Sequence, residues 1–234
     1  MKKLITCLLL ITTFAISAQK IYWTNYTFNV ADEDEATVYK LIDDYFSENK
    51  MEGVTVTLYA NHFHDADNNW THVIGFSGTL DAMGAMYAAD GGDAWDLLGA
   101  RLDHFIKDGT GARMGTVKQT HGDTEGDYPI QRYYILDAED ADAMEKALTK
   151  FNTDNKPKGW LMMMGNFTSG VSPEGENHWA LVGYKDFKGA MGGASSFLTE
   201  KEQEARDAGW KTFVENNGGV RMVRSGLRVR LGQW

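Results

Sequence analysis

The chain has 234 residues, with 33 acidic against 23 basic side chains and a formal net charge of −10 at pH 7. Such an acidic surface repels nucleic-acid phosphates and anionic lipid headgroups, so nucleic acid is excluded as an expected partner. Aromatic residues make up 12% of the chain and only 3 residues are proline, a composition that predicts a packed core and argues against disorder.

The first 18 residues have the order of a secretory signal peptide. Two lysines follow Met1, an apolar run covers residues 4–16, and small residues precede Gln19. The apolar run is too short for a membrane span, although a signal anchor is the alternative interpretation. We expect export to the periplasm or the medium, with no integral membrane segment after cleavage. Loss of Lys2 and Lys3 would move the net charge from −10 to −12.

The single cysteine, Cys7, lies inside this segment. The mature chain would then contain no cysteine. That composition excludes disulfides, catalysis by a thiolate, and zinc or iron–sulfur sites with cysteine ligands. An exported chain without disulfides needs a core large enough to fold unaided, and the length of this chain allows one.

Residues 19–120 predict a first module with the element order β-α-β-β-α-β. Strands are predicted where apolar and polar residues alternate, and helices where apolar residues recur at a spacing of three to four. The expected elements are strands over residues 21–30, 54–63, 70–78 and 112–120, with helices over 32–46, 79–89 and 94–107. Gly91 and Gly92 interrupt the second helical region.

A polar, glycine-bearing segment over residues 121–127 predicts a linker, after which residues 128–234 predict a second module. The element order is the same. The expected strands cover residues 131–136, 159–167, 178–184 and 220–231, and the expected helices cover residues 141–151 and, with breaks, 187–216.

The two modules share landmarks at an offset of 108 residues. The offset relates Gly75 to Gly183, Ala82-Met83-Gly84 to Ala190-Met191-Gly192, and Arg113 to Arg221. Matches spread over a whole unit indicate two copies of one structural module. We therefore predict an α+β fold of two tandem ferredoxin-like modules, packed sheet to sheet as an intramolecular α/β barrel. Because the fusion supplies each sheet with its partner, we expect a monomer or a weak homo-oligomer.

In element order, in the break within each second helical region and in the repeated Ala-Met-Gly, residues 21–231 resemble the dimeric α/β-barrel superfamily in its tandem-fused form. This superfamily includes heme-degrading and cofactor-free monooxygenases, chlorite-dismutase-like heme enzymes and small proteins with no known activity. The resemblance implies a ligand site between sheet and helices or within the barrel. No subfamily's functional residues match positions of this chain, so none are assigned from it.

Three histidines near one hairpin form a candidate metal site. If the hairpin is centred near residue 67, His62 lies opposite His72, and three imidazoles can converge on one ion with help from Asp65 or Asp67. The alternative is a solvated hairpin end, and a slip of one residue would turn the last histidine to the other face. The candidate metal ligands are His62, His64 and His72. No cofactor is required by the sequence.

Polar and aromatic strand residues form a candidate ligand pocket between the modules. Ligand pockets combine apolar walls with a few orienting polar groups, and paired guanidinium groups can bind a carboxylate. Structural roles in the core, at the rim or in ion pairs are the alternative. The candidate ligand-binding residues are Asn25, Tyr59, Asn61, Arg113, Tyr134, Trp179 and Arg221.

Two further features have a functional and a structural interpretation. His104 lies in a predicted helix, where a heme ligand is conceivable, but its neighbours carry no heme signature and favour a surface histidine. The methionine-rich strand over residues 160–164 suggests either apolar packing or a copper(I) site, and packing is the favoured interpretation.

Three functions stay open at this point. An exported small-molecule-binding or accessory protein is favoured, because the sequence contains no nucleophile elbow, phosphate loop, His-Glu-x-x-His or dinucleotide-binding glycine pattern. The first alternative is an enzyme, either a barrel-type monooxygenase or a histidine–metal catalyst, acting on a small aromatic or apolar substrate. The second is a structural or interaction protein whose barrel is filled by its own side chains.

Overall fold

The computed structural model describes residues 20–65 and 68–234. The predicted signal peptide, Cys7 and Asp67 lie outside the described residues. Among the residues described, no helix is both long enough and apolar enough to span a membrane.

The first module has the predicted β-α-β-β-α-β order. Its helical region is divided at Gly92, whose φ of +65° lies in the left-handed region that glycine adopts without strain. The elements are β1 (Tyr22–Val30), η1 (Asp32–Asp34), α1 (Glu35–Glu48), β2 (Val54–His64), β3 (His72–Gly78), α2 (Leu80–Ala88), α3 (Gly92–Leu102) and β4 (Ile106–Gly122).

The second module repeats this order. Thr199 and Glu202 form a reciprocal capping box that fixes the start of its longest helix. The elements are β5 (Ile130–Ala138), α4 (Ala141–Asp154), β6 (Trp160–Ser169), β7 (His178–Tyr184), α5 (Phe187–Gly192), η2 (Gly193–Ser196), α6 (Glu200–Asn216) and β8 (Val220–Gln233).

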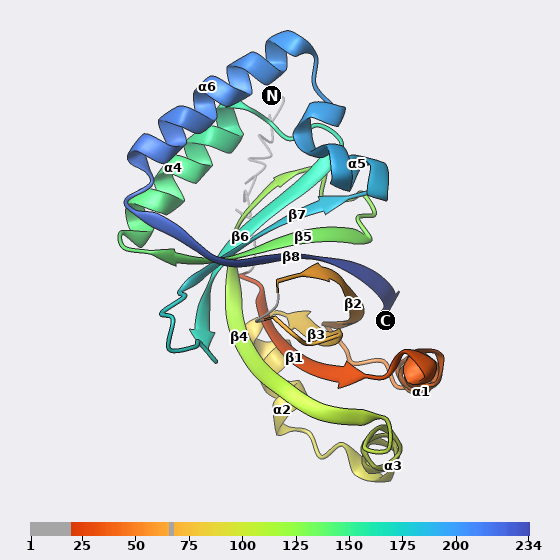
Figure 1. Cartoon of the computed structure of the whole chain (residues 1–234). Coiled ribbons are helices and arrows are strands. Elements are labelled where there is room, and N and C mark those ends of the chain that lie inside the picture. The colour runs from red at the N-terminus through yellow and green to blue at the C-terminus, as the bar shows by residue number, and fades with distance from the viewer. Residues whose placement is uncertain (1–19, 66–67) are drawn as a thin grey trace, which may run out of the picture.

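The eight strands form one closed antiparallel barrel in the order β1-β3-β2-β8-β5-β7-β6-β4. The modules meet at both sheet edges, where β2 pairs with β8 and β4 pairs with β6. The two sheets also face each other across the barrel interior, so the predicted intramolecular α/β barrel is confirmed (Figure 1). Closure leaves no free sheet edge in the barrel.

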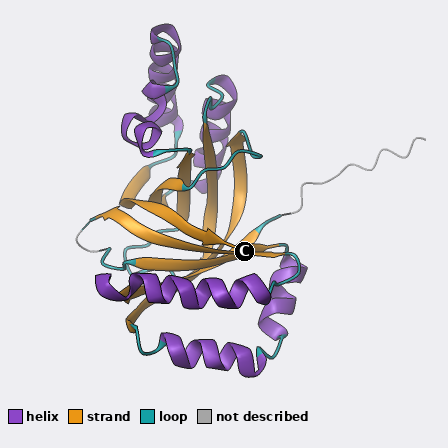
Figure 2. Cartoon of the chain, turned by 90° about the vertical axis from the view of Figure 1, so that its right-hand side faces the viewer, coloured by secondary structure: helices purple, strands orange, loops and turns teal. Residues whose placement is uncertain are grey.

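The helices lie outside the barrel in two groups, one over each module's sheet (Figure 2). In the first module, Val38, Ile42 and Phe46 of α1 pack on the outer face of the sheet. In the second, Met144, Leu148 and Phe151 of α4 take the corresponding place. On the helices the apolar residues recur every three to four positions, and on the strands they recur every second position. These two spacings predicted the element order from the sequence.

The last helix of the first module is shorter than predicted. Helix α3 ends at Leu102, and β4 begins at Ile106 because it continues pairing along β1, with Val30 opposite Ile106 and Thr27 opposite Gly111. Two register shifts interrupt this pairing. Figure 1 shows that β4 curves away from the barrel at its end next to α3. Because the helix ends early and the strand begins early, α3 lies at the outer end of this curved strand.

Candidate functional site

A cavity of about 330 Å³ occupies the barrel interior. Four residues of the predicted ligand pocket line it: Asn25, Tyr59, Arg113 and Trp179. Asn61 lies beside them and accepts a hydrogen bond of 3.0 Å from the hydroxyl of Tyr133, a lining residue that sequence reasoning missed. Burial raises the pKa of Tyr133 to about 12, so its hydroxyl stays protonated at neutral pH.

The other two predicted ligand residues lie elsewhere. Tyr134 points to the outer face of the sheet and packs on the apolar cluster under α4, because strand neighbours alternate between faces. Arg221 is exposed at the start of β8 and pairs with Asp137 at 3.1 Å. Arg113 lies opposite Asn25, near the middle of β1, whereas Arg221 lies opposite Asp137, near the end of β5. The two arginines are therefore not equivalent, and the predicted pair of guanidinium groups does not form.

Arg113 instead has an internal carboxylate partner. Its Nη2 lies 2.9 Å from Oε1 of Glu176, whose side chain is fully buried. Ser172 also donates to this carboxylate through its hydroxyl and its backbone N–H. These hydrogen bonds and Arg113 hold the pKa of Glu176 below its ordinary value, against the desolvation that burial imposes. The charge of Arg113 is thus neutralised within the chain.

Glycines give the interior its shape. Four glycines on the lumen side each lie directly opposite a larger side chain on the neighbouring strand. A methyl group on Gly115 would meet the Trp23 ring at 2.6 Å, and one on Gly165 would meet the Trp179 ring at 2.8 Å. The two indoles therefore lie over glycine backbone and meet edge to face at 5.7 Å. The four pairs are Gly75 with Asn25, Gly115 with Trp23, Gly165 with Trp179, and Gly226 with Tyr133.

The predicted three-histidine site does not form. The hairpin register places Ala60, not His62, opposite His72. His72 points outward, where its ring stacks on Phe28 with centroids 5.8 Å apart, while His64 is exposed at the hairpin end. Among the residues described, no three histidine, cysteine or carboxylate side chains gather in an arrangement able to hold a metal ion.

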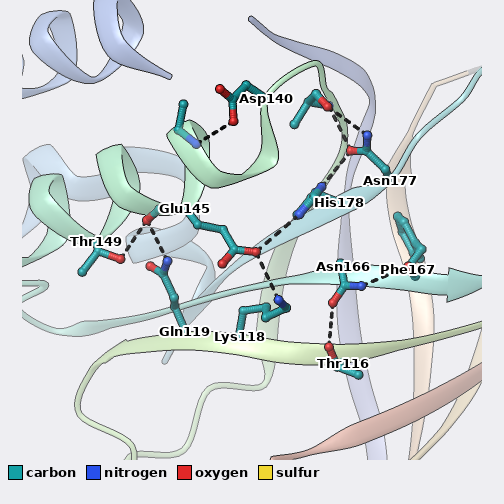
Figure 3. A network of polar contacts seen from close by, with 12 residues as sticks. Thr116, Lys118, Gln119, Asp140, Glu145, Thr149, Asn166, Phe167, Asn177 and His178 are labelled. Carbon is teal, nitrogen blue, oxygen red and sulfur yellow. Dashed lines mark hydrogen bonds and ion pairs between the residues drawn. The ribbon is translucent and has the colours of Figure 1, made fainter. Parts of the chain in front are cut away.

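His72 has a counterpart in the second module. His178 also opens the third strand of its module, and both imidazoles face a glutamate of the first helix, at 3.9 Å from Glu35 and 3.7 Å from Glu145. Figure 3 shows His178 held between Asn177 and Glu145. Burial lowers the pKa of both histidines. These groups are neutral, packed parts of the repeated scaffold.

A second, larger cavity of about 820 Å³ lies outside the barrel, between the first module's sheet and its helices. Its walls are almost entirely apolar and aromatic, and they come from β1, β3, β4, α1, α2 and α3. The principal lining residues are Phe28, Ile42, Phe46, Phe76, Trp95 and Leu98. His104 is exposed and does not line the cavity, so the conceivable heme ligand is not placed there.

One polar chain interrupts these apolar walls. The hydroxyls of Tyr26 and Tyr87 lie 2.7 Å apart, and Tyr87 donates to Oγ1 of Thr24 at 2.7 Å. Tyr87 donates its one hydroxyl proton to Thr24, so Tyr26 is the donor in the hydrogen bond between the two tyrosines. The lone pairs of the Tyr26 oxygen are then left as acceptors. Burial, with a smaller effect of Tyr87, raises the pKa of Tyr26 to about 12.

The corresponding space in the second module is filled. Met162, Met164 and Phe213 close the gap between its sheet and the helices α4 and α6. The methionine-rich strand therefore serves packing, as predicted. The outer helices of the two modules also differ in length, since α6 has 17 residues and α3 has 11.

No family model matches the chain, and a comparison with curated proteins finds no match. Solved structures do match over almost the whole length. A proposed monooxygenase of Fusobacterium nucleatum is 14% identical with a TM-score of 0.58, covering 92% of this chain and 94% of that chain. An anthrone oxidase-like protein is 12% identical with a TM-score of 0.54, covering 93% and 94%.

A variant chlorite dismutase from Candidatus Nitrospira defluvii is 11% identical with a TM-score of 0.55, covering 92% of this chain and 93% of that chain. At such identities the likeness concerns the fold alone. The chain therefore has the fold of the dimeric α/β barrels, with both halves of the barrel in one polypeptide.

Proposed function

We propose that this protein is a monooxygenase-like enzyme that binds a small aromatic substrate in the outer cavity of its first module. The cavity carries the proposal: about 820 Å³ of apolar, aromatic-lined space is within the roughly 300–1,000 Å³ typical of small-molecule sites. The likeness to a proposed monooxygenase and to an anthrone oxidase-like protein supports the choice of reaction class. Binding alone, without turnover, is the competing function.

The walls favour a flat, largely apolar guest. Phe46 and Trp95 present aromatic surface with ring centroids 6.3 Å apart, and Phe46 also lies 6.1 Å from Phe76. Offset and edge-to-face contacts with such rings stabilise an aromatic ligand beyond the burial of its area. No charged residue is among the lining residues, all of which are described, so a charged ligand would lose its hydration without compensation.

Tyr26 supplies the orienting contact. Its oxygen can accept a hydrogen bond from a phenol or enol hydroxyl, while its own proton is held by Tyr87. A substrate of this kind is electron-rich and can transfer its hydroxyl hydrogen to dioxygen. Anthrone presents such a hydroxyl in its enol tautomer, and its oxidation to anthraquinone converts the methylene carbon into a carbonyl, consumes one dioxygen and releases one water. The role of the protein would be to bind, orient and shield the ring system.

The test uses anthrone as the probe, with calorimetry for binding and an oxygen electrode with anthraquinone absorbance for turnover. We expect the wild type to bind anthrone and to form anthraquinone faster than the buffer control does. Ala112→Trp places a large ring at the exposed mouth of the cavity and should abolish both. Met114→Trp, on the same strand but outside the lining, is the matched control and should retain both.

The two measurements separate the competing functions. Binding without faster oxygen consumption contradicts the enzymatic proposal and favours the binding function. Absence of binding, or equal binding by the two tryptophan variants, contradicts the site itself.

A further inference from the structure

We propose that the barrel interior is a second, separate ligand site, specific for a small aromatic or apolar carboxylate whose anionic group pairs with Arg228. This site lies inside the barrel and shares only Thr27, Phe76 and Gly111 with the lining of the outer cavity, and its lining includes arginines where that of the outer cavity has no charged residue. It is therefore separate from the proposed oxygenation site. The cavity of about 330 Å³ suits a molecule of single-ring size.

Of the three arginines that line the interior cavity, Arg228 is the one with no acidic partner among residues 20–65 and 68–234. Arg113 pairs with Glu176, and Arg224 pairs with Glu174 at 2.9 Å. Among the residues described, Arg228 forms no ion pair: its Nε donates to Oε1 of Gln131 at 2.9 Å, and its guanidinium lies 4.0 Å from the Tyr59 ring centroid.

The two terminal nitrogens of Arg228 have no partner in the part of the chain that the structure describes, and Arg228 lines the interior cavity. The Tyr59 ring and the Gln131 amide fix the plane of the Arg228 guanidinium group. A planar guanidinium held in this way can pair with a carboxylate through two parallel hydrogen bonds. Burial lowers the pKa of Arg228, because a cation in this interior lacks full hydration.

Two further donors are unused in the same cavity wall. The indole nitrogens of Trp23 and Trp179 are buried and have no acceptor among the residues described. Both side chains line the cavity. Buried N–H groups are nearly always paired, so two orphan donors in the wall of the cavity that Arg228 also lines indicate an interior suited to a guest rich in acceptors. Tyr59, Trp70 and Phe167 provide the apolar surface for its body.

Benzoate is the probe, and benzamide is its neutral counterpart of equal shape. We expect calorimetry to show benzoate binding to the full-length protein at least tenfold more tightly than benzamide. Arg228→Gln should weaken benzoate at least tenfold and leave benzamide unchanged, while Arg228→Lys should retain part of the preference. Arg221→Gln removes an exposed arginine from the same strand and should leave binding as in the wild type.

Several outcomes would overturn the assignment. They are no benzoate binding to the wild type, equal binding of benzoate and benzamide, and unchanged benzoate affinity in Arg228→Gln. The comparison of the two probes needs no variant, so it stands even if Arg228→Gln fails to fold. Ala112→Trp, which blocks the outer cavity, should bind benzoate normally, and loss of benzoate binding there would place the anion in the outer cavity instead.

Discussion

At the scale of single residues, the interior of the barrel is shaped by which positions lack a side chain. Trp179 takes its place because Gly165 lies opposite it, and Trp23 because Gly115 does. The absence of a Cβ at these points is a steric requirement, since none of the four lumen glycines has a positive φ.

Gly165→Ala should therefore destabilise the fold. The added methyl group would meet the carbonyl oxygen of Thr116 and the Trp179 ring, and neither can move without shifting a strand. We expect a loss of about 1–3 kcal/mol in the free energy of unfolding, measured by denaturant titration. Gly84→Ala is the control: nothing lies within 4 Å of its added methyl group, and it should be neutral or stabilising by up to about 1 kcal/mol. Equal effects of the two substitutions would show that interior crowding is not the cause.

Part of the interior could be predicted from residue type. Asn25 and Tyr59 were identified as polar or aromatic residues of predicted strands, but the sequence did not show which strand face lines the interior, so Tyr134 was identified with them. Arg228 was missed for a physical reason: β8 also carries Arg221, Arg224 and Arg230, and the sequence does not show which of them finds a carboxylate. Only the three-dimensional positions of Glu174, Asp137 and Asp127 leave Arg228 as the one without an acid among the residues described.

At the scale of elements, the two modules repeat a polar joint as well as their strand order. The backbone N–H of Val30 donates to Thr71 at 2.9 Å, and that of Ala138 donates to Asn177 at 2.9 Å. Each acceptor directly precedes the buried histidine of its module. The joint ties the end of the first strand to the start of the third. The histidine belongs to it, because its Nδ1 lies 2.9 Å from the Thr71 hydroxyl in the first module and 2.7 Å from Oδ1 of Asn177 in the second.

These histidines predict a pH dependence of stability. Burial lowers the pKa of His72 and His178 in the folded chain, whereas the unfolded value is about 6.5. The unfolded chain therefore binds protons first, so the free energy of unfolding should fall as pH drops from about 6.5 through the lower folded pKa. The Glu145 carboxylate reduces this effect at His178 without reversing it.

Denaturant titration at pH 7 and pH 5 measures the effect. A double variant, His72→Gln with His178→Gln, should be less stable at pH 7 but lose less stability on acidification than the wild type does. The exposed His62→Gln serves as the control and should follow the wild type. A double variant with the wild-type pH dependence would show that the buried imidazoles do not cause it.

The elements differ in how far sequence determined them. Strand and helix order followed from periodicity, but the hairpin between β2 and β3 did not, because a polar turn fixes its centre only within a residue or two. The prediction therefore placed His62 opposite His72, whereas the structure has Ala60 in that position. The end of α3 was likewise missed, since Phe105 and Ile106 continue a helical pattern while β1 offers Ile106 a strand partner.

At the scale of the whole molecule, closure of the barrel couples the modules. The backbone of Val56 exchanges two hydrogen bonds, of 3.1 and 2.9 Å, with that of Trp234 in the second module. The Trp234 indole also donates to Asp43 at 2.9 Å and lies 5.8 Å from the Phe46 ring. The end of the second module thus packs against α1, the helix that forms one wall of the outer cavity.

The repeat predicted this architecture but not the site, because the two outer spaces diverged. Duplicated modules bury similar surfaces, so their shared pattern reveals the common core. A cavity in one copy depends instead on where a helix ends and which side chains fill the space. Met162 and Phe213 fill it in the second module, and the displaced α3 leaves it open in the first.

The central claim is that an uncharged aromatic substrate of the anthrone type binds once per chain, between the first sheet and its helices. A crystal structure of the protein soaked with a bromine-substituted anthrone tests it most directly, because the anomalous signal of bromine locates the ring. We expect one bromine site per chain, in the cavity walled by Phe46, Phe76 and Trp95, with the substrate oxygen within hydrogen-bonding distance of Tyr26. Bromine found only in the barrel interior or over the second module, or no bound bromine at all, would contradict the claim.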